Sequence, residues 1–137
     1  MSTFPVSIQL SVAWGEQDLF GHVNNVVYFR YFENVRMYYL ERIGILHSYA
    51  ETGIGVILAS TTCDFKKPVE WPQRLTIRTG CDHVGNTSFI LKYEIHNEVG
   101  DLVAAGSSVQ VMYDHHRRTK VPLPDGVIAA IAALQGA

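Results

Sequence analysis

The chain has 137 residues, of which 47% are apolar and 18% charged, and its formal net charge is -2. This length suits one domain, residues 1–137, and the apolar share is enough for a folded core, which excludes a disordered chain. The near-neutral charge gives no general attraction for nucleic acid or an anionic membrane, so we expect neither as a partner, and a local patch must hold any anionic ligand.

The N-terminal residues lack the basic start and continuous apolar run of a signal peptide. No apolar run approaches the roughly 20 residues that span a bilayer. Cys63 and Cys81 both fall in predicted strands, and we expect two reduced thiols rather than a disulfide. These features together predict a cytoplasmic protein.

Residues 6–14 (VSIQLSVAW) alternate between apolar and polar side chains, which predicts a strand with one buried face. A loop follows over residues 15–23, with Gly21 as its flexible point. Asn24 or Asn25 then suits the N-cap of a helix, because an asparagine side chain accepts a hydrogen bond from the first free backbone N–H groups.

Residues 26–43 contain neither glycine nor proline and predict a helix of about five turns, which Gly44 would end. In helical projection, Arg30, Asn34 and Glu41 form one polar stripe, and aromatic or aliphatic residues cover most of the remaining surface. We therefore expect other elements to enclose this helix.

Four later segments, residues 55–65, 74–83, 88–97 and 102–113, are rich in β-branched and aromatic side chains, which predicts four strands. Turn signals between the last three predict an antiparallel meander. Prolines at 68 and 72 mark a longer crossing, and residues 127–134 predict a short terminal helix. The order β-α-β-β-β-β predicts an α+β domain, in which a five-stranded antiparallel sheet curls around the central helix.

Polar side chains gather between the first strand and the central helix, among them Glu16, Gln17, Asp18 and His22. A helix start offers unpaired N–H groups and the positive end of the macrodipole, which can polarise a carbonyl. A carboxylate just upstream could attack that carbonyl or activate a water molecule. Asp18 could instead serve only a turn, although six residues separate it from Asn24, too many for an ordinary N-cap. Both interpretations stay open at this point.

The run WGEQDLFGHVNNVVYFRYFENVRMYYLERIGI resembles the signature region of the 4-hydroxybenzoyl-CoA thioesterase family. That signature pairs an aspartate with a nearby glycine, an HVNN-like step, a tyrosine and an acidic-then-arginine helix. The segments FKKPVEWPQRLTIRT and VQVMYDHHRRTKVPLP are similar to later parts of the family pattern, so the resemblance spans residues 8–124. It implies the hotdog fold, a sheet wrapped around a long helix, and hydrolysis of an acyl-CoA without a cofactor.

The resemblance also implies roles for particular residues. Asp18 matches the catalytic carboxylate, which serves as nucleophile or general base. Asn25 matches the position whose backbone N–H points at the thioester carbonyl, and Gly21 matches the small residue of the connecting loop. His22 is expected either to contact substrate or to hydrogen-bond within the loop. Family members pair through edge strands into dimers, often tetramers, with active sites at the dimer interface.

Other side chains are candidates for binding an acyl-CoA. Asn24 and Tyr28 lie next to the catalytic positions. Glu33 and Arg36 are three residues apart, so they either form a buried or interface ion pair, or Glu33 shapes the acyl pocket. Coenzyme A carries phosphates, which require basic groups near the mouth of the site. The candidates for that role are Arg117, Arg118 and Lys120, together with Lys66, Lys67, Arg74 and Arg78.

No metal site is expected, because the six histidines are scattered and no cysteine pair has zinc spacing. Two other functions remain: a non-catalytic hotdog protein that binds acyl-CoA or an acyl carrier protein, and an enoyl-thioester hydratase. The segment DLFGH lacks the Asn-Pro step usual in hotdog hydratases. Phe20 stands where plant-type acyl-carrier-protein thioesterases have an asparagine. The sequence leaves the acyl group unspecified.

Overall fold

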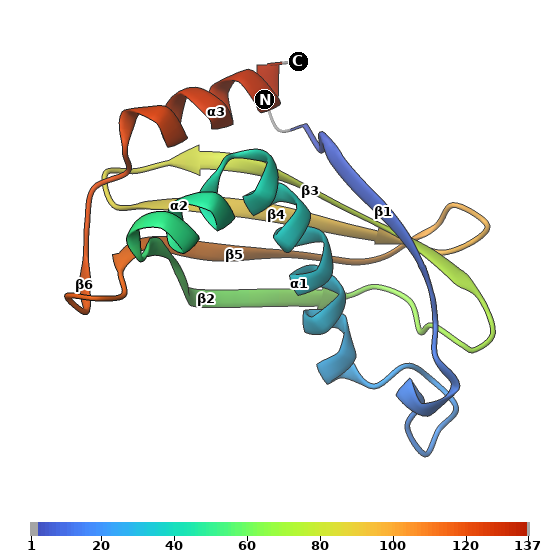
Figure 1. The fold of residues 1–137 in the computed structure, drawn as a ribbon. Coiled ribbons are helices and arrows are strands. Elements are labelled where there is room, and N and C mark those ends of the chain that lie inside the picture. Colours follow the sequence, from blue (N-terminus) through green and yellow to red (C-terminus); the bar gives the residue numbers. More distant parts are fainter. Residues whose placement is uncertain (1–2, 137) are drawn as a thin grey trace.

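A computed structural model describes residues 3–136. Five long strands form an antiparallel sheet in the order β1-β3-β4-β5-β2. They are β1 (Val6–Ser11), β2 (Ile54–Phe65), β3 (Arg74–Val84), β4 (Ser88–His96) and β5 (Leu102–Asp114). The sheet curls around helix α1 (Asn25–Arg42), as Figure 1 shows. The predicted α+β architecture is confirmed, and each predicted strand is present.

The aromatic face of α1 explains why the sheet encloses the helix. Tyr28, Phe32 and Tyr39 are at most 2% exposed, and burying such a ring stabilises the fold by about 1.5–3 kcal/mol. Phe32 stacks on Tyr93 of β4 with ring centroids 4.5 Å apart. Gly106 of β5 makes this close approach possible, because an added Cβ would come within 2.5 Å of the Phe32 ring. The predicted polar stripe of α1 is exposed.

The boundaries of α1 follow from its flanking residues. The Asn24 side chain accepts from the N–H of Val26 at 3.1 Å, so Asn24 rather than Asn25 is the N-cap. Gly44 has φ +84°, a left-handed conformation that favours glycine. The chain then enters helix α2 (Ile45–Thr52), which the sequence did not predict. Its eight residues are bounded by a second left-handed glycine, Gly53.

Two further differences concern short elements. Strand β1 ends at Ser11, and Trp14 belongs to a 3-10 turn, η1 (Trp14–Glu16), instead of the strand. A two-residue strand, β6 (Thr119–Lys120), pairs with the end of β5 and makes the sheet six-stranded. Both elements are too short to show an alternating pattern.

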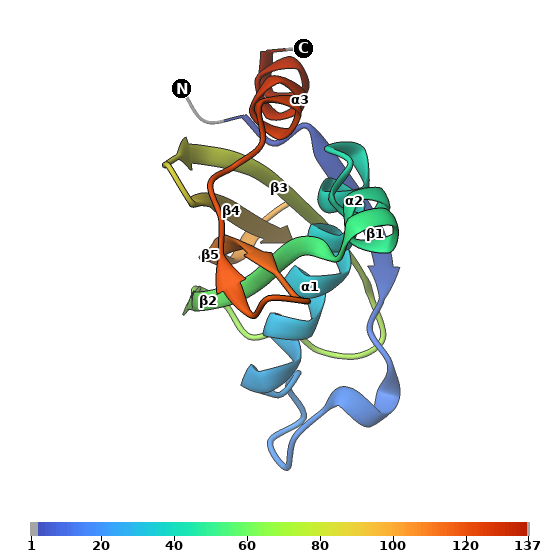
Figure 2. The ribbon, with the colours of Figure 1, turned by 60° about the vertical axis from the view of Figure 1, so that its left-hand side comes forward.

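Helix α3 (Asp125–Gly136) closes the end of the barrel-like sheet where α1 terminates, as Figures 1 and 2 show. Gln135 joins three parts of the chain there. Its Oε1 accepts from the Tyr39 hydroxyl and from the Cys81 N–H, both at 2.8 Å, and its Nε2 donates to the carbonyl of Thr3 at 3.2 Å. Cys81 and Cys63 are not joined by a disulfide in this structure.

Strands β1 and β2 form the edges of the sheet and lie on either side of α1 (Figure 2). Strand β2 pairs with β5 along one side, with a register shift between Leu58 and Ser60. Its other side has no partner strand within residues 3–136. Among the described helices, none is long and apolar enough to cross a membrane.

Candidate active site

A tight loop between η1 and α1 holds Asp18. The Asp18 N–H donates to the carbonyl of His22 at 2.8 Å, and the Gly21 N–H donates to the carbonyl of Asp18 at 3.1 Å. Gly21 has φ +78°, which explains the glycine at this position. Asp18 Oδ1 accepts from the N–H of Phe20 at 2.9 Å and from that of His22 at 3.4 Å. The loop thus fixes one carboxylate oxygen and leaves Oδ2 available.

Glu16 attaches this loop to α1. Its Oε1 accepts from the Tyr31 hydroxyl and from the Ala13 N–H, both at 2.8 Å, and its backbone carbonyl accepts from the N–H of Asn24. Burial raises the pKa of Tyr31, and the neighbouring Glu16 carboxylate raises it further. The phenol therefore stays a donor at ordinary pH, and the Asp18 loop is held against the helix at its base.

Asp18 and the first residue of α1, Asn25, line one pocket of about 260 Å³. The other lining residues come from the loop, from α1 and from the segment after β2: His22, Val23, Tyr28, Phe65, Lys66, Lys67 and Pro68. A first helical residue has no intrahelical acceptor for its N–H, and the macrodipole makes this end of the helix positive. The pocket therefore combines a carboxylate with a backbone donor suited to a carbonyl oxygen.

Tyr28 and Cys63 remain protonated near this pocket. Tyr28 is 2% exposed and packs edge-on against Phe65 with centroids 4.9 Å apart. Burial raises the pKa of Tyr28, so it presents a neutral phenol. Burial, with a smaller effect of Asp64, raises the pKa of the Cys63 thiol to about 11. A thiol protonated at neutral pH is a poor nucleophile, so Cys63 is not suited to attack a substrate carbonyl.

His22 and two lysines surround the same opening. The backbone of His22 supports the Asp18 loop, and its Nε2 lies 4.0 Å from Glu70 Oε1. Lys67 forms an ion pair with Asp101 at 3.1 Å, whereas Lys66 lines the pocket beside it. Phe65 and Pro68 were not recognised as pocket residues from the sequence. The FKKP run at the end of a predicted strand was the available signal.

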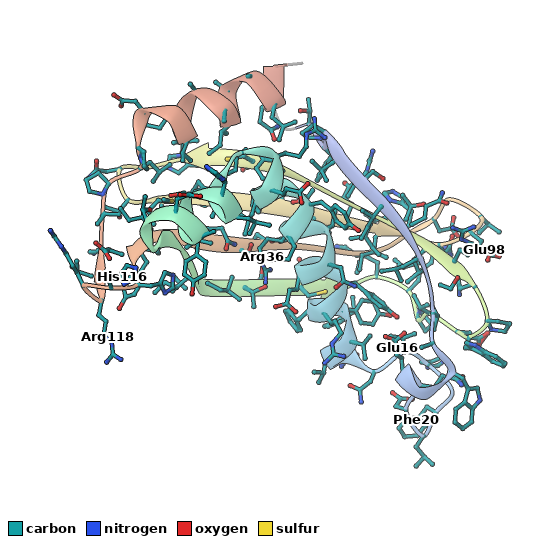
Figure 3. All side chains as sticks on the ribbon, viewed as in Figure 1. Glu16, Phe20, Arg36, Glu98, His116 and Arg118 are labelled. Carbon is teal, nitrogen blue, oxygen red and sulfur yellow. The ribbon has the colours of Figure 1, made fainter. Side chains whose placement is uncertain are left out.

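Several candidates lie outside this pocket. Glu33 is exposed on α1, and Arg36 donates to the Tyr93 hydroxyl at 3.4 Å instead of pairing with Glu33 in the same chain. Arg117 and Arg118 belong to the turn between β5 and β6. Figure 3 shows Arg118 at the opposite end of the molecule from Phe20 and the Asp18 loop. One chain therefore does not bring either arginine to Asp18.

Asn24 and Arg78 have local roles in the structure. The Asn24 side chain caps α1, and Arg78 is bound to Glu94 at 2.6 Å across the outer face of the sheet. No group of three or more His, Cys, Asp or Glu side chains within residues 3–136 could hold a metal ion.

Comparison with known proteins gives relatives over nearly the whole chain. A 33% identical stretch of 110 residues is shared with the uncharacterized protein YsmA of Bacillus subtilis, covering 80% of this chain and 74% of YsmA. The structure of a putative thioesterase from Pseudomonas aeruginosa matches with a TM-score of 0.84 at 27% identity. The match covers 95% of this chain and 100% of that chain. A Thermus thermophilus thioesterase, solved with coenzyme A and zinc, has a TM-score of 0.87 at 25% identity, covering 98% and 96% of the two chains.

These structural matches confirm that the sheet wrapped around α1 is the hotdog fold. The family model described as the thioesterase-like superfamily matches residues 12–131, a span that includes the Asp18 loop, α1 and the whole sheet from β2 onward. The chain therefore belongs to the thioesterase-like superfamily.

Proposed function

We propose that this protein hydrolyses an acyl-CoA thioester to the free acid and coenzyme A. One observation carries the proposal: Asp18 and the first residue of α1 line the same pocket. A carboxylate and a helix-start N–H are together enough for hydrolysis of an activated acyl group. Membership of the thioesterase-like superfamily supports the same reaction class.

In the proposed reaction, the thioester carbonyl oxygen accepts a hydrogen bond from the Asn25 N–H. Asp18 Oδ2 then either removes a proton from a water molecule that attacks the carbonyl carbon, or attacks that carbon itself and forms an anhydride that water cleaves. The carbon–sulfur bond breaks in either case. The products are the carboxylic acid and the coenzyme A thiol, which leaves as a thiolate without obligatory protonation. Developing charge on the carbonyl oxygen is stabilised by the positive end of α1.

The neighbouring residues support this chemistry without taking part in bond making. Gly21 and His22 hold the loop that orients Asp18, and Asn24 caps the helix that presents Asn25. Tyr28 and Phe65 offer an apolar wall with a neutral phenol for the acyl group. Lys66 lines the pocket, and its ammonium group would attract a coenzyme A phosphate. The two free thiols agree with a reducing compartment such as the cytoplasm.

A homodimer, or a tetramer built from dimers, completes the proposed site. A pocket of about 260 Å³ in one chain is smaller than the roughly 300–1,000 Å³ typical of sites for drug-sized ligands. The unpaired edge of β2 runs from the β5–β6 turn toward the Asp18 loop. Antiparallel pairing of two such edges would bring Arg117 and Arg118 of a second copy toward Asp18. Their predicted role in phosphate binding thus requires the dimer.

The proposal is tested by measuring thiol release from aromatic, short, medium and long acyl-CoAs, with equilibrium binding of each compound measured in parallel. We expect turnover of at least one compound, with release of one thiol per acid formed. Binding without thiol release across the panel would instead identify an acyl-CoA binding protein. Loss of the enoyl absorbance from unsaturated substrates, again without thiol release, would identify a hydratase.

A further inference from the structure

The loop that holds Asp18 ends in two large apolar side chains that are exposed to solvent. Leu19 is 93% exposed and Phe20 is 80% exposed. Figures 1 and 2 show this loop, between η1 and α1, extending away from the sheet, and Figure 3 places Phe20 at one extremity of the molecule. A contiguous exposed apolar patch marks a surface that binds a protein or a membrane. The tip of this loop is therefore a candidate contact surface.

Both tryptophans of the chain flank the same loop. Trp14, in η1 at the start of the loop, is 69% exposed, and Trp71, in the segment before β3, is 44% exposed. The Trp71 segment is tied to the loop, because the N–H of Val23 donates to the carbonyl of Val69 at 2.8 Å. Four exposed side chains thus occupy one end of the molecule, and we call them the apolar tip: Trp14, Leu19, Phe20 and Trp71.

The proposed dimer does not account for the whole apolar tip. It pairs the β2 edges, and β1 and β2 are the opposite edges of the sheet. Trp14 follows β1, whereas Trp71 precedes β3, the strand that pairs with β1. Pairing through β2 therefore leaves the exposure of both tryptophans unexplained.

Three exposed cations at the same end take part in no ion pair. Lys66 lines the candidate active-site pocket, Arg74 begins β3 opposite the last residue of β1, and Arg30 lies in the second turn of α1. None of them belongs to an ion pair within residues 3–136. The carboxylates at this end already have hydrogen-bond or ionic contacts within the chain: Glu16, Asp18 and Glu70. The end as a whole is therefore complementary to a surface that is both apolar and anionic.

We infer that the apolar tip docks on a lipid bilayer that carries anionic headgroups. Leu19 and Phe20 insert among the acyl chains, and the two indoles lie at the level of the headgroups, where tryptophan is enriched. The three unpaired cations face the anionic lipids. The net charge of -2 predicts no general attraction to such a surface, so this local patch supplies the attraction. The pocket that Asp18 lines is at the same end, so docking brings it next to the bilayer.

An apolar groove on another protein is the alternative partner for the tip. We favour the bilayer because tryptophans and cations around a protruding apolar loop are the side chains that lipid headgroups attract. The docking requires no membrane-spanning helix, since the contact is peripheral.

Tryptophan fluorescence of the full-length protein tests the docking directly, because both tryptophans belong to the tip. The protein is titrated with vesicles of phosphatidylcholine that contain about one third phosphatidylglycerol. The emission should shift to the blue as the indoles leave water, and lipids brominated on their acyl chains should quench it. Vesicles of phosphatidylcholine alone should bind at least about 10-fold more weakly, because they offer the three cations no anionic partner.

Replacing the inserted side chains should remove most of this binding. Leu19→Ser and Phe20→Ser should each lower the vesicle partition coefficient on the order of 10-fold, since each takes a large apolar side chain out of the acyl region. Co-sedimentation with vesicles measures the partition coefficient, and circular dichroism checks the fold. Val99→Ser is the matched control and should bind like wild type, because Val99 is 81% exposed but lies in the turn between β4 and β5.

A second pair of variants tests the charges. Arg74→Gln should weaken binding to the anionic vesicles about 5-fold and leave binding to phosphatidylcholine unchanged. Arg118→Gln makes the same change at the opposite end of the molecule (Figure 3) and should alter neither.

Wild-type protein that neither shifts its emission nor co-sediments with either kind of vesicle would overturn the inference. Binding that Leu19→Ser and Phe20→Ser leave intact, or that Val99→Ser weakens equally, would also overturn it. If these two loop variants, still folded, lost self-association in sedimentation velocity while wild type did not bind vesicles, the tip would be a contact between copies instead. None of these measurements involves hydrolysis, so the docking and the proposed function can fail independently.

Discussion

The polar groups at the two ends of α1 differ in whether they have hydrogen-bond partners within the chain. At the C-terminal end, the Gln135 amide accepts from Tyr39 and Cys81 and donates to Thr3, so the hydrogen-bonding groups are satisfied within the chain. At the N-terminal end, Asp18 and Asn25 line a pocket, and a first helical residue has no intrahelical acceptor for its N–H. Leaving a buried donor or acceptor without a partner costs about 1–3 kcal/mol. Unpaired donors and acceptors are therefore tolerated only where solvent or a ligand can reach them. The contrast separates the end that stabilises the fold from the end that can do chemistry.

The largest expected effect of a backbone change is at Asn25. Proline is well tolerated at the first position of a helix, and Asn24 already has the extended ψ of 138° that a following proline requires. Asn25→Pro should therefore preserve α1 while removing the N–H that polarises the carbonyl. We expect kcat to fall by about 10²–10³-fold, as for loss of one oxyanion donor.

Asn25→Ala is the matched control, because it removes the side chain and keeps the N–H. Its kcat should stay within a few-fold of the wild-type value. Equal losses in the two variants would assign the effect to the side chain and contradict the role of the backbone donor.

A smaller effect is expected at the base of the Asp18 loop. Tyr31→Phe removes the hydroxyl that donates to Glu16 at 2.8 Å, which loosens the loop without touching the pocket. We expect kcat to fall by about 10-fold with little change in KM, because orientation of Asp18 affects the chemical step more than binding. Tyr38→Phe, at a position 55% exposed on the same helix, should change neither constant. A change in KM alone would indicate substrate contact instead.

At the opposite end of α1, the expected effect is on stability. Gln135→Ala leaves the Tyr39 hydroxyl and the Cys81 N–H without their shared acceptor. The free energy of unfolding, from urea denaturation, should fall by about 1–3 kcal/mol, while kcat/KM at a temperature well below the transition stays unchanged. Exposed Gln9 provides the control, since Gln9→Ala should affect neither quantity. A large loss of activity in Gln135→Ala would break the separation between the two ends.

The smallest expected effect concerns Cys63. Its folded pKa of about 11 exceeds the roughly 8.5 of an unfolded cysteine, so the folded chain holds this proton more tightly. Its contribution to stability is present below about pH 8.5 and is lost as pH rises toward 11. Cys63→Ala should therefore show a weaker loss of stability than wild type between pH 8.5 and 11 in denaturant titrations, with hydrolysis unimpaired at neutral pH. Impaired hydrolysis would implicate the thiol in catalysis.

The long elements could be predicted because their patterns are long. Eighteen residues without glycine or proline predicted α1, and extended runs of β-branched residues predicted every long strand. Helix α2 was missed because its eight residues form a short amphipathic segment directly after a helix-ending glycine. Strand β6 has only two residues and exists through its pairing with β5. These two short elements therefore depend on contacts with the rest of the fold, which a local sequence pattern does not record.

The site residues likewise fall into those that the sequence could group and those that only the fold brings together. Asp18, Gly21 and Asn25 lie close in sequence, so one loop and one helix start bring them together. The contribution of Lys66 depends on where β2 ends in space, which no local pattern records. The sequence also grouped Glu33 with Arg36 by spacing, whereas the fold buries the arginine against Tyr93 and leaves the glutamate exposed.

The central claim is that the Asp18 carboxylate carries out thioester hydrolysis. The most direct measurement is the initial rate of thiol release by wild type and by Asp18→Asn, using the best acyl-CoA of the panel, together with the unfolding midpoint of each protein. The amide keeps an oxygen that can accept from the Phe20 N–H, so the loop should persist and the midpoint should not change. The rate should fall by about 10²–10⁴-fold, the usual contribution of a catalytic base. Undiminished thiol release by a folded Asp18→Asn protein would contradict the account.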